Sequence, residues 1–287
     1  MKGIVWLASY PKSGNTWFRT FLTNFLRDGE APASINLLSG GPIASARQPF
    51  DQAVGYDSGE LTCDEVDLLR PEVYLYQARE AKETSFCKIH DAYTFLPGGR
   101  PLIPPEATAC ALYFIRNPLD VAVSFAHHSG HNRFGRMIRQ MANAENSFCA
   151  TDATEENQLR QKLLTWSQHV ESWADAAGIR LLVLRYEDMK LRPEETFGAA
   201  VRFAGLPDDP ARVKKAIEFS RFEERQKQET AAGFAEKMPG AKSFFRKGEI
   251  GSWREVLTPE HVATVVADHS RVMRRFGYLD ESGAPIF

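Results

Sequence analysis

The sequence predicts an α/β fold with a central parallel sheet that is flanked by helices. Four short apolar runs of strand length alternate with longer segments, several of which have the apolar spacing of an amphipathic helix. Strands that alternate with helices, rather than with hairpin turns, are typical of a parallel sheet. The predicted strands span residues 3–8, 85–90, 109–115 and 180–185.

The helices are predicted from apolar spacing and from start signals. Residues 18–26 and 157–177 carry apolar side chains three or four positions apart, which places them on one helix face. Pro118 suits the first turn of a helix over 119–128, because proline lacks the N–H that this turn leaves unbonded. The other expected segments are an irregular surface stretch over 28–60, one or two helices over 61–82 with Pro71 between them, short helices and loop over 129–156, two or three helices over 193–228, a mobile loop over 229–253, and a final helix over 259–276.

Length and charge limit the classes of protein that are possible. The chain has 287 residues, enough for one large core, and is expected to form a single domain over 1–287. Its net charge of −2 argues against a nucleic-acid binder that works through a global positive field. A site for an anion must therefore be built from local charges.

The cysteines and the apolar runs indicate the compartment. The four cysteines form no C-x-x-C pair, and Cys87 and Cys110 lie in predicted strands, where cysteine behaves as a small apolar residue. A reducing compartment is expected. No apolar run approaches the ~20 residues of a membrane span, and the N-terminal residues show no basic-then-apolar leader. We expect a cytoplasmic protein.

The segment between the first strand and the first helix has the parts of a phosphate-binding loop. It reads YPKSGNTW, in which Gly14 lets the chain turn and the Asn15 and Thr16 side chains are expected to cap the helix. This arrangement aims backbone N–H groups and a positive dipole end at an anion, and Lys12 adds a full charge. The spacing differs from the G-x-x-x-x-G-K-[ST] loop of nucleoside-triphosphate enzymes. The simplest alternative is an ordinary connection that binds nothing.

Two later segments supply further cations. RNPLDVAVSFAH begins with Arg116 at a strand end, where its planar fork suits phosphate oxygens, and Ser124 lies two helical turns on. RKGEIGSW begins with Arg246 and Lys247, and its two glycines let backbone N–H groups approach an anion. The alternatives are a structural ion pair between Arg116 and Asp120, and a solvated basic turn.

All three segments resemble motifs of one family. YPKSGNTW is similar to YPKSGTTW, the 5′-phosphosulfate-binding loop of the sulfotransferases that use 3′-phosphoadenosine 5′-phosphosulfate (PAPS), with Asn15 where the family often has threonine. RNPLDVAVSFAH resembles the 3′-phosphate-binding segment RNPxDVAVSxxH, and RKGEIGSW resembles RKGxxGxW of the same family. The resemblance extends from Tyr10 to Trp253 and implies a P-loop-like three-layer fold.

The resemblance also assigns a role to each residue of a nucleotide site. PAPS is the implied co-substrate, and no metal is implied because lysine and arginine supply the positive charge. The implied contacts are Lys12, Ser13, Gly14, Asn15 and Thr16 at the phosphosulfate; Arg116, Ser124, Arg246, Lys247 and Gly248 at the 3′-phosphate; and Trp17, Tyr186, Ser220 and Phe222 elsewhere on the nucleotide, with Trp17 and Phe222 near adenine.

Lys88 and His90 carry the predicted chemistry. Residues two apart in a strand point to the same face, so both side chains are expected to project together. KIH resembles the family's K-T-H element, whose histidine takes the proton from the acceptor hydroxyl. The resemblance makes Lys12 the stabiliser of charge on the departing 5′-phosphate and Lys88 a second stabiliser of the transferring group.

The positions of four candidate residues favour one shared site. Lys12, His90, Arg116 and Tyr186 each follow or end a predicted strand. In open parallel sheets, ligands bind beyond the carboxyl ends of the strands.

Three alternatives remain open at this stage. A P-loop kinase would need Mg²⁺ ligands and a triphosphate loop, and a nucleotide-binding module without catalysis would not need both Lys12 and His90. His127, His128 and His131 include an i, i+4 pair that could hold a metal, but no further ligand has convincing spacing.

The acceptor is expected to be a small hydrophobic alcohol or phenol, or an amine. Residues 28–60, 129–156 and 229–245 are predicted to form its pocket and lid. Their aromatic side chains are Phe50, Tyr56, Phe134, Phe148 and Phe234. The family's KTVE-type dimer motif is not found near residues 254–260, so the oligomeric state stays open, and no nucleic-acid partner is expected.

Overall fold

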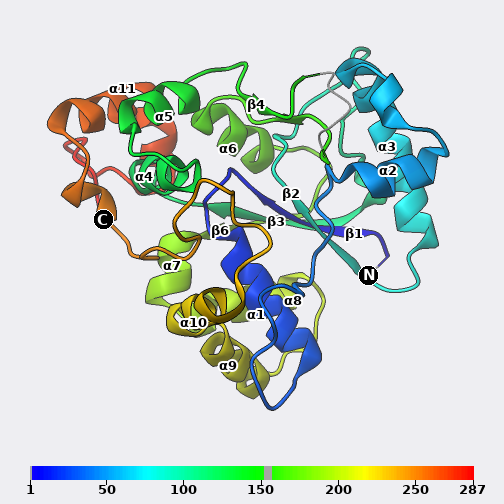
Figure 1. Ribbon diagram of the computed structural model, residues 1–287, viewed down its shortest axis with the longest axis horizontal. Helices are drawn as coiled ribbons and strands as arrows, with labels where there is room; N and C mark the ends of the chain where they lie inside the picture. Colours follow the sequence, from blue (N-terminus) through cyan, green and yellow to red (C-terminus); the bar gives the residue numbers. More distant parts are fainter. Residues whose placement is uncertain (1, 152–156) are drawn as a thin grey trace. The chain divides into compact units, whose positions relative to one another are not determined.

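The central sheet is built from β1 (Ile4–Ser9), β2 (Ser85–Ile89), β3 (Thr108–Ile115) and β6 (Leu181–Arg185). In this computed structural model, which describes residues 2–151 and 157–287, the strand order is β2-β1-β3-β6 (Figure 1). β1 pairs in parallel with β2 and with β3. The predicted α/β fold with a central parallel sheet flanked by helices is confirmed.

The remaining elements of the described chain are helices and one short pair of antiparallel strands. Ser147–Phe148 (β4) pairs antiparallel with Gln161–Lys162 (β5). The helices are α1 (Asn15–Arg27), α2 (Arg47–Val54), α3 (Cys63–Glu80), α4 (Pro118–His128), α5 (Phe134–Met141), α6 (Trp166–Ala174), α7 (Tyr186–Leu191), α8 (Pro193–Phe203), α9 (Pro210–Phe219), α10 (Phe222–Ala232) and α11 (Pro259–Arg275).

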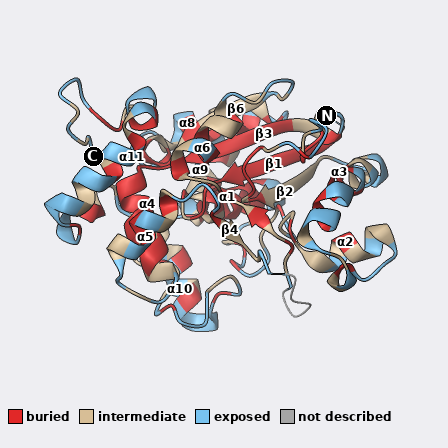
Figure 2. Ribbon diagram, turned by 90° about the horizontal axis from the view of Figure 1, so that it is seen from above, coloured by how far each residue is buried: buried red, intermediate tan, exposed pale blue. Residues whose placement is uncertain are grey.

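Burial explains why the strands could be predicted from the sequence. All of β1 and the last six residues of β3 are buried (Figure 2). Inner strands of a parallel sheet are covered on both faces and therefore read as continuous apolar runs. At the edge strand β2, Lys88 donates its backbone N–H to the Gly40 carbonyl at 2.9 Å and accepts from the Ala44 N–H at 2.8 Å. These bonds cover an edge that would otherwise be open to pairing.

Several predicted boundaries were wrong, for local reasons. Pro71 lies inside α3 instead of dividing it, and α3 is fixed at its start by a capping box between Thr62 and Glu65. The helix predicted over 157–177 is only α6, because β5 occupies its first part and Leu164 has a positive φ of 59°. The segment 28–60 is not wholly irregular, since it contains α2. Part of the segment predicted over 129–156 lies outside the described residues.

The chain divides into two compact units, which are described separately. Unit 1 comprises Met1–Tyr10, Gly40–Phe114 and Ala144–Val183. Unit 2 comprises Pro11–Ser39, Ile115–Asn143 and Leu184–Phe287. Unit 1 therefore contains β1, β2 and most of β3 and β6, and unit 2 contains α1, α4, α5 and α7 to α11.

Each unit has its own apolar core. In unit 1 the buried Trp6 ring packs edge-on against Tyr74, and its N–H donates to Thr108 Oγ1 at 2.9 Å. In unit 2 the ring centroids of Phe21 in α1 and Phe197 in α8 are 4.4 Å apart. Buried aromatic pairs of this kind add stability beyond the area that they bury.

Candidate functional site

The loop before α1 is held in an unusual backbone conformation. Lys12 has a φ of 70°, which is sparsely populated for a residue with a Cβ, and Gly14 has a φ of 105°. Gly14 is the N-cap of α1 and no side chain caps this end, so the predicted capping by Asn15 and Thr16 is wrong. The first N–H groups of a helix have no partner inside the helix. This end of α1 can therefore bind an anion.

Two glycines of the predicted site have no room for a side chain. A Cβ on Gly14 would lie 2.8 Å from Tyr186 Cδ2, and one on Gly248, whose φ is 63°, would lie 2.7 Å from Phe222 Cδ2. The Tyr186 hydroxyl donates to the Gly248 carbonyl at 2.7 Å. Four residues singled out in the sequence, from four separate segments of unit 2, are thus in contact.

Arg116 joins the predicted segments of unit 2. It follows β3, lies 4.2 Å above the Tyr186 ring, and donates to the Glu249 carbonyl at 2.9 Å and to the Lys12 carbonyl at 3.4 Å. Its nearest distance to an Asp120 oxygen is 3.9 Å, without a hydrogen bond. The simple alternative, that Arg116 serves mainly as an ion-pair partner of Asp120, is therefore not favoured.

Asp120 instead anchors the last motif. Its carboxylate accepts from Gly251 N–H at 2.8 Å, Ser252 Oγ at 3.1 Å and Trp253 N–H at 3.1 Å. Charge-assisted bonds to backbone N–H groups are among the stronger hydrogen bonds in proteins. They fix the C-terminal end of RKGEIGSW on α4.

Glu229 of α10 fixes the other end of this segment. Its carboxylate oxygens accept from Phe244 N–H at 2.6 Å and Phe245 N–H at 2.9 Å. The stretch predicted as a mobile loop is therefore held by carboxylates on both sides of Arg246 and Lys247. This role of Glu229 could not be predicted, because neither periodicity nor a motif marks a residue that bonds to a distant backbone.

Lys12 has an aromatic neighbour that the motifs did not predict. Its ammonium lies 3.8 Å from the centroid of the Phe244 ring, within the range of a cation–π interaction. Lys247 makes an ion pair with Glu255. Ser124 is half-buried on α4, and the buried Ser220 donates its hydroxyl to the Ile217 carbonyl at 3.0 Å.

Arg225 is a buried cation that the motifs did not predict. It lies 5.4 Å from the Trp17 ring and 5.8 Å from the Phe222 ring, and its Nε donates to the Ser220 carbonyl at 3.0 Å. No carboxylate pairs with it among the described residues, although it is only 7% exposed. Burial lowers the pKa of Arg225 to about 10. A buried cation without a counter-charge is unfavourable, and an anionic ligand would relieve that cost.

Neighbouring cations of unit 2 disfavour one another's charge. Burial lowers the pKa of Arg246, and repulsion by Arg116 adds to this effect. Loss of solvation likewise lowers the pKa of Lys190, and repulsion by Arg225 and by Arg116 lowers it further. Nearby carboxylates oppose this effect, since Glu255 raises the pKa of Arg246, and Glu223 and Glu249 raise that of Lys190.

Several buried polar atoms of the same segments have no hydrogen-bond partner among the residues that the structure describes. Three of them are donors that could face a ligand: Ser13 Oγ, Trp17 Nε1 and Arg116 Nε. Buried groups of this kind are rare, and a ligand can satisfy them. The unpartnered donors and the neighbouring cations fit a nucleotide with more than one phosphate.

In unit 1 His90 follows β2 and has a defined tautomer. Its Nδ1 lies 2.8 Å from the Ser9 carbonyl oxygen and 3.3 Å from Ser9 Oγ. A carbonyl only accepts hydrogen bonds, so Nδ1 carries a proton, and in the neutral ring Nε2 then keeps its lone pair. His90 therefore has the protonation pattern of a general base. Lys88 and His90 are both half-buried.

Two aromatic residues predicted for the acceptor pocket are buried. Phe50 packs in a core cluster with Val66, Val73 and Leu159. Phe234 is likewise buried against Ile35 and Phe245. Within residues 2–151 and 157–287, no group of three or more metal-binding side chains is close enough to hold a metal ion. No helix of that part is long and apolar enough to cross a bilayer.

A comparison with protein families decides the class. Residues 2–277 match the family model described as "Sulfotransferase domain". The chain belongs to the sulfotransferase family. This confirms the family and the enzyme class predicted from the three motifs, a PAPS-dependent sulfotransferase.

Relatives of this sulfotransferase agree with that class. It is 25% identical to Sulfotransferase 1A1 of Canis lupus familiaris over 94% of this chain and 83% of that protein. It is 24% identical to Cytosolic sulfotransferase 1 of Arabidopsis thaliana over 88% and 73% of the two chains. Among solved structures, retinol dehydratase in complex with androsterone and the inactive cofactor PAP has the same fold, with a TM-score of 0.62, 20% identity, and coverage of 94% and 80%.

Proposed function

We propose that this sulfotransferase moves the sulfuryl group of PAPS to a hydroxyl, or an amine, of a small hydrophobic acceptor. Unit 2 would bind the nucleotide, and His90 of unit 1 would take the acceptor proton. We further propose that residues 1–287 act as one sulfotransferase domain, which agrees with a family match over 2–277.

The observation that carries this proposal is the set of contacts around Arg116. Its side chain lies above Tyr186 and bonds to the backbone at Lys12 and at Glu249, so it joins the loop before α1, the start of α7 and the RKGEIGSW segment. These are the segments that the family resemblance assigns to one doubly phosphorylated nucleotide. An unrelated anion would not need this combination.

The proposed chemistry is an in-line displacement that needs one proton acceptor. When bound, PAPS supplies the sulfuryl group and its 5′-phosphate is the leaving group. The acceptor oxygen forms a bond to sulfur, the bond between sulfur and the 5′-phosphate oxygen breaks, and the acceptor proton passes to His90 Nε2. The Ser9 carbonyl, which faces Nδ1 at 2.8 Å, would stabilise the imidazolium that results.

Cations would stabilise the charge that grows on the leaving group. Lys12 and the N–H groups at the start of α1 suit the 5′-phosphate. Arg116 and Arg246 suit the 3′-phosphate, for which two cations are reasonable because a phosphate monoester carries about −1.5 to −2 charges. Lys88 is the proposed second stabiliser of the transferring group. Since these side chains supply the positive charge, the proposal needs no metal.

The acceptor and the location are the least constrained parts of the proposal. Retinol dehydratase binds androsterone in one solved structure and retinol in another, and both are hydrophobic alcohols. This supports a hydrophobic alcohol or phenol as acceptor. The name of the Arabidopsis relative supports a cytoplasmic location.

A transfer assay tests the proposal. Purified protein is given ³⁵S-labelled PAPS and a panel of alcohols and phenols, with a metal chelator present. We expect labelled sulfate esters with PAPS and no product from ATP and Mg²⁺. Phosphoryl transfer from ATP, without any transfer from PAPS, would instead support the kinase alternative.

A further inference from the structure

The backbone of His90 is held by a second, buried histidine. His169 lies on α6 in unit 1 with no exposed surface, and its Nε2 is 3.0 Å from the His90 carbonyl oxygen. Because a carbonyl only accepts, His169 Nε2 must carry the proton. His169 Nδ1 is then an acceptor.

Tyr113 of β3 fixes this tautomer of His169. Its hydroxyl lies 2.8 Å from His169 Nδ1, so it donates to that nitrogen. The arrangement requires a neutral imidazole, and burial lowers the pKa of His169 to about 4. A directed series of bonds therefore runs from Tyr113 through His169 to the His90 carbonyl.

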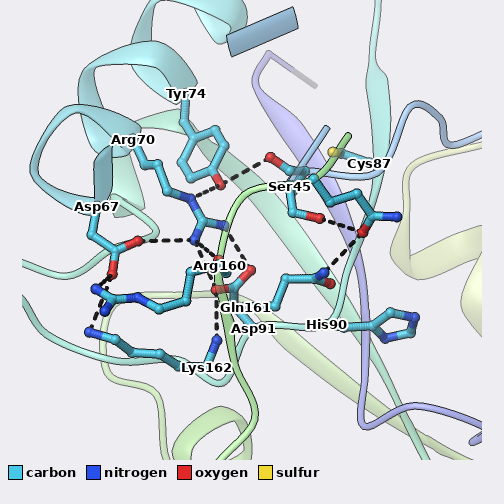
Figure 3. Close-up of polar contacts among 12 residues, drawn as sticks. Ser45, Asp67, Arg70, Tyr74, Cys87, His90, Asp91, Arg160, Gln161 and Lys162 are labelled. Atoms are coloured by element: carbon cyan, nitrogen blue, oxygen red, sulfur yellow. Dashed lines mark hydrogen bonds and ion pairs between the residues drawn. The ribbon is translucent and has the colours of Figure 1, made fainter. Parts of the chain in front are cut away.

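The next residue, Asp91, is held equally firmly. Trp173 of α6 donates its ring N–H to the Asp91 carbonyl at 2.9 Å. Arg70 of α3 bonds to both carboxylate oxygens of Asp91, at 2.9 and 2.7 Å, and both side chains are buried. In Figure 3 the Asp91 side chain points toward Arg70, whereas the His90 ring lies on the other side of the backbone.

We propose that His169 is a positioning residue for His90. By donating to the His90 carbonyl in the tautomer that Tyr113 fixes, it holds the backbone at the place from which His90 Nδ1 reaches the Ser9 carbonyl. The catalytic consequence rests on the proposed role of His90 as the base. The effect on the His90 ring does not depend on that role.

Three variants separate positioning from simple packing. His169→Phe keeps a ring but removes both hydrogen bonds, and His169→Gln keeps an amide N–H that can donate to the carbonyl. Tyr113→Phe removes only the hydroxyl that fixes the tautomer. The matched control is His269→Phe, because His269 is the other buried histidine whose pKa burial lowers to about 4, and it lies in unit 2.

The first measurement is the ¹⁵N chemical shifts of the His90 ring, identified by their loss in His90→Gln. In the wild type and in His269→Phe we expect the form protonated at Nδ1. In His169→Phe and Tyr113→Phe we expect a mixture of tautomers, and in His169→Gln a return toward the wild type. If His169→Phe does not fold, the His90 tautomer in Tyr113→Phe is the deciding measurement. An unchanged His90 tautomer in the folded variants would overturn the proposal.

The second measurement is turnover and nucleotide affinity. We expect kcat to fall about ten- to a hundredfold in His169→Phe, with the Kd for 3′-phosphoadenosine 5′-phosphate within about twofold of the wild type, because small misplacements of a reacting group slow chemistry more than binding. His169→Gln should recover most of the rate. If His90→Ala is inactive but His169→Phe and Tyr113→Phe have the wild-type rate, the positioning role of His169 is refuted and the proposed function stands. If the His90 tautomer changes in these variants but the wild type transfers no sulfuryl group, the positioning role stands and the proposed function is refuted.

Discussion

The two units differ in how some of their cations are neutralised. In unit 1 three cations are paired with buried carboxylates: Arg70 with Asp91, and Arg160 and Lys162 with Asp67 (Figure 3). In the described part of unit 2, neither Arg225 nor Arg246 has a carboxylate partner within ion-pair distance. A buried cation without a carboxylate partner can bind an anionic ligand, whereas Arg70 is already neutralised by Asp91.

The two units also illustrate two ways in which a fold can prepare residues for a ligand or a reaction. Unit 2 keeps positive charges close together at a cost in repulsion, which a phosphorylated ligand would relieve. Unit 1 holds His90, the proposed base, with hydrogen bonds from neutral groups, and the next residue, Asp91, with an ion pair to Arg70. Substitutions are therefore expected to have different effects on stability and on binding in unit 1 and in unit 2.

The largest effect is expected from His90→Ala. Loss of a general base lowers turnover by roughly 10² to 10⁴. The Kd for 3′-phosphoadenosine 5′-phosphate should stay nearly the same, because the predicted nucleotide residues lie in unit 2. Steady-state rates and calorimetry measure both quantities, with His131→Ala as the control histidine. A normal rate in His90→Ala would remove His90 from the mechanism.

Arg70→Met should have the largest effect on stability. It leaves the buried Asp91 without its partner, which costs about 3–5 kcal/mol of unfolding free energy. Arg225→Met removes a buried cation that has no carboxylate partner, so we expect a loss below about 1 kcal/mol, or a gain, together with weaker nucleotide binding. Urea unfolding measures the first effect, and Arg192→Met, in an exposed ion pair, is the control. Equal losses for Arg70→Met and Arg225→Met would contradict the comparison.

Arg116→Ala should change the selectivity for the nucleotide. Hydrogen bonds to charged groups contribute about 1.5–3 kcal/mol, so affinity for 3′-phosphoadenosine 5′-phosphate should fall roughly ten- to a hundredfold. Affinity for adenosine 5′-phosphate, which lacks the 3′-phosphate, should fall much less. Calorimetry with both ligands measures the difference. An equal loss for both would mean that Arg116 does not bind the 3′-phosphate.

The smallest effect is a dependence of stability on pH. Burial lowers the pKa of both His169 and His269 to about 4, below the ~6.5 of an unfolded histidine. Between these values the unfolded chain binds more protons than the folded one, so stability falls as the pH drops from 6.5 toward 4. Each histidine contributes up to about 1.4 kcal/mol per pH unit. Urea unfolding of His269→Gln should show a weaker dependence in this window, and an unchanged slope would refute the assignment.

The sequence allowed the strands and the nucleotide loop to be predicted because their signals are local. β1 and β3 are buried apolar runs, and Lys12 to Trp17 directly follow β1. The helix over 157–177 failed because the start of α6 is set by the Thr165 capping box, and apolar spacing alone does not show it.

The supporting residues could not be predicted because their partners are far away in the sequence. Arg70 lies 21 residues before Asp91, and His169 lies 79 residues after His90. Arg225 is marked by the lack of a carboxylate partner among the described residues, which only the fold reveals. The motifs therefore gave the candidate site residues, and the structure was needed to find the groups that hold them.

The most direct test of the central claim is a calorimetric titration of the wild type with 3′-phosphoadenosine 5′-phosphate, with chelator present and at two salt concentrations. We predict one site per chain, tighter binding than for adenosine 5′-phosphate, and weaker binding at high salt, because cations of unit 2 would hold the phosphates. Folded protein that does not bind this nucleotide, or that binds both nucleotides equally well, would contradict the account.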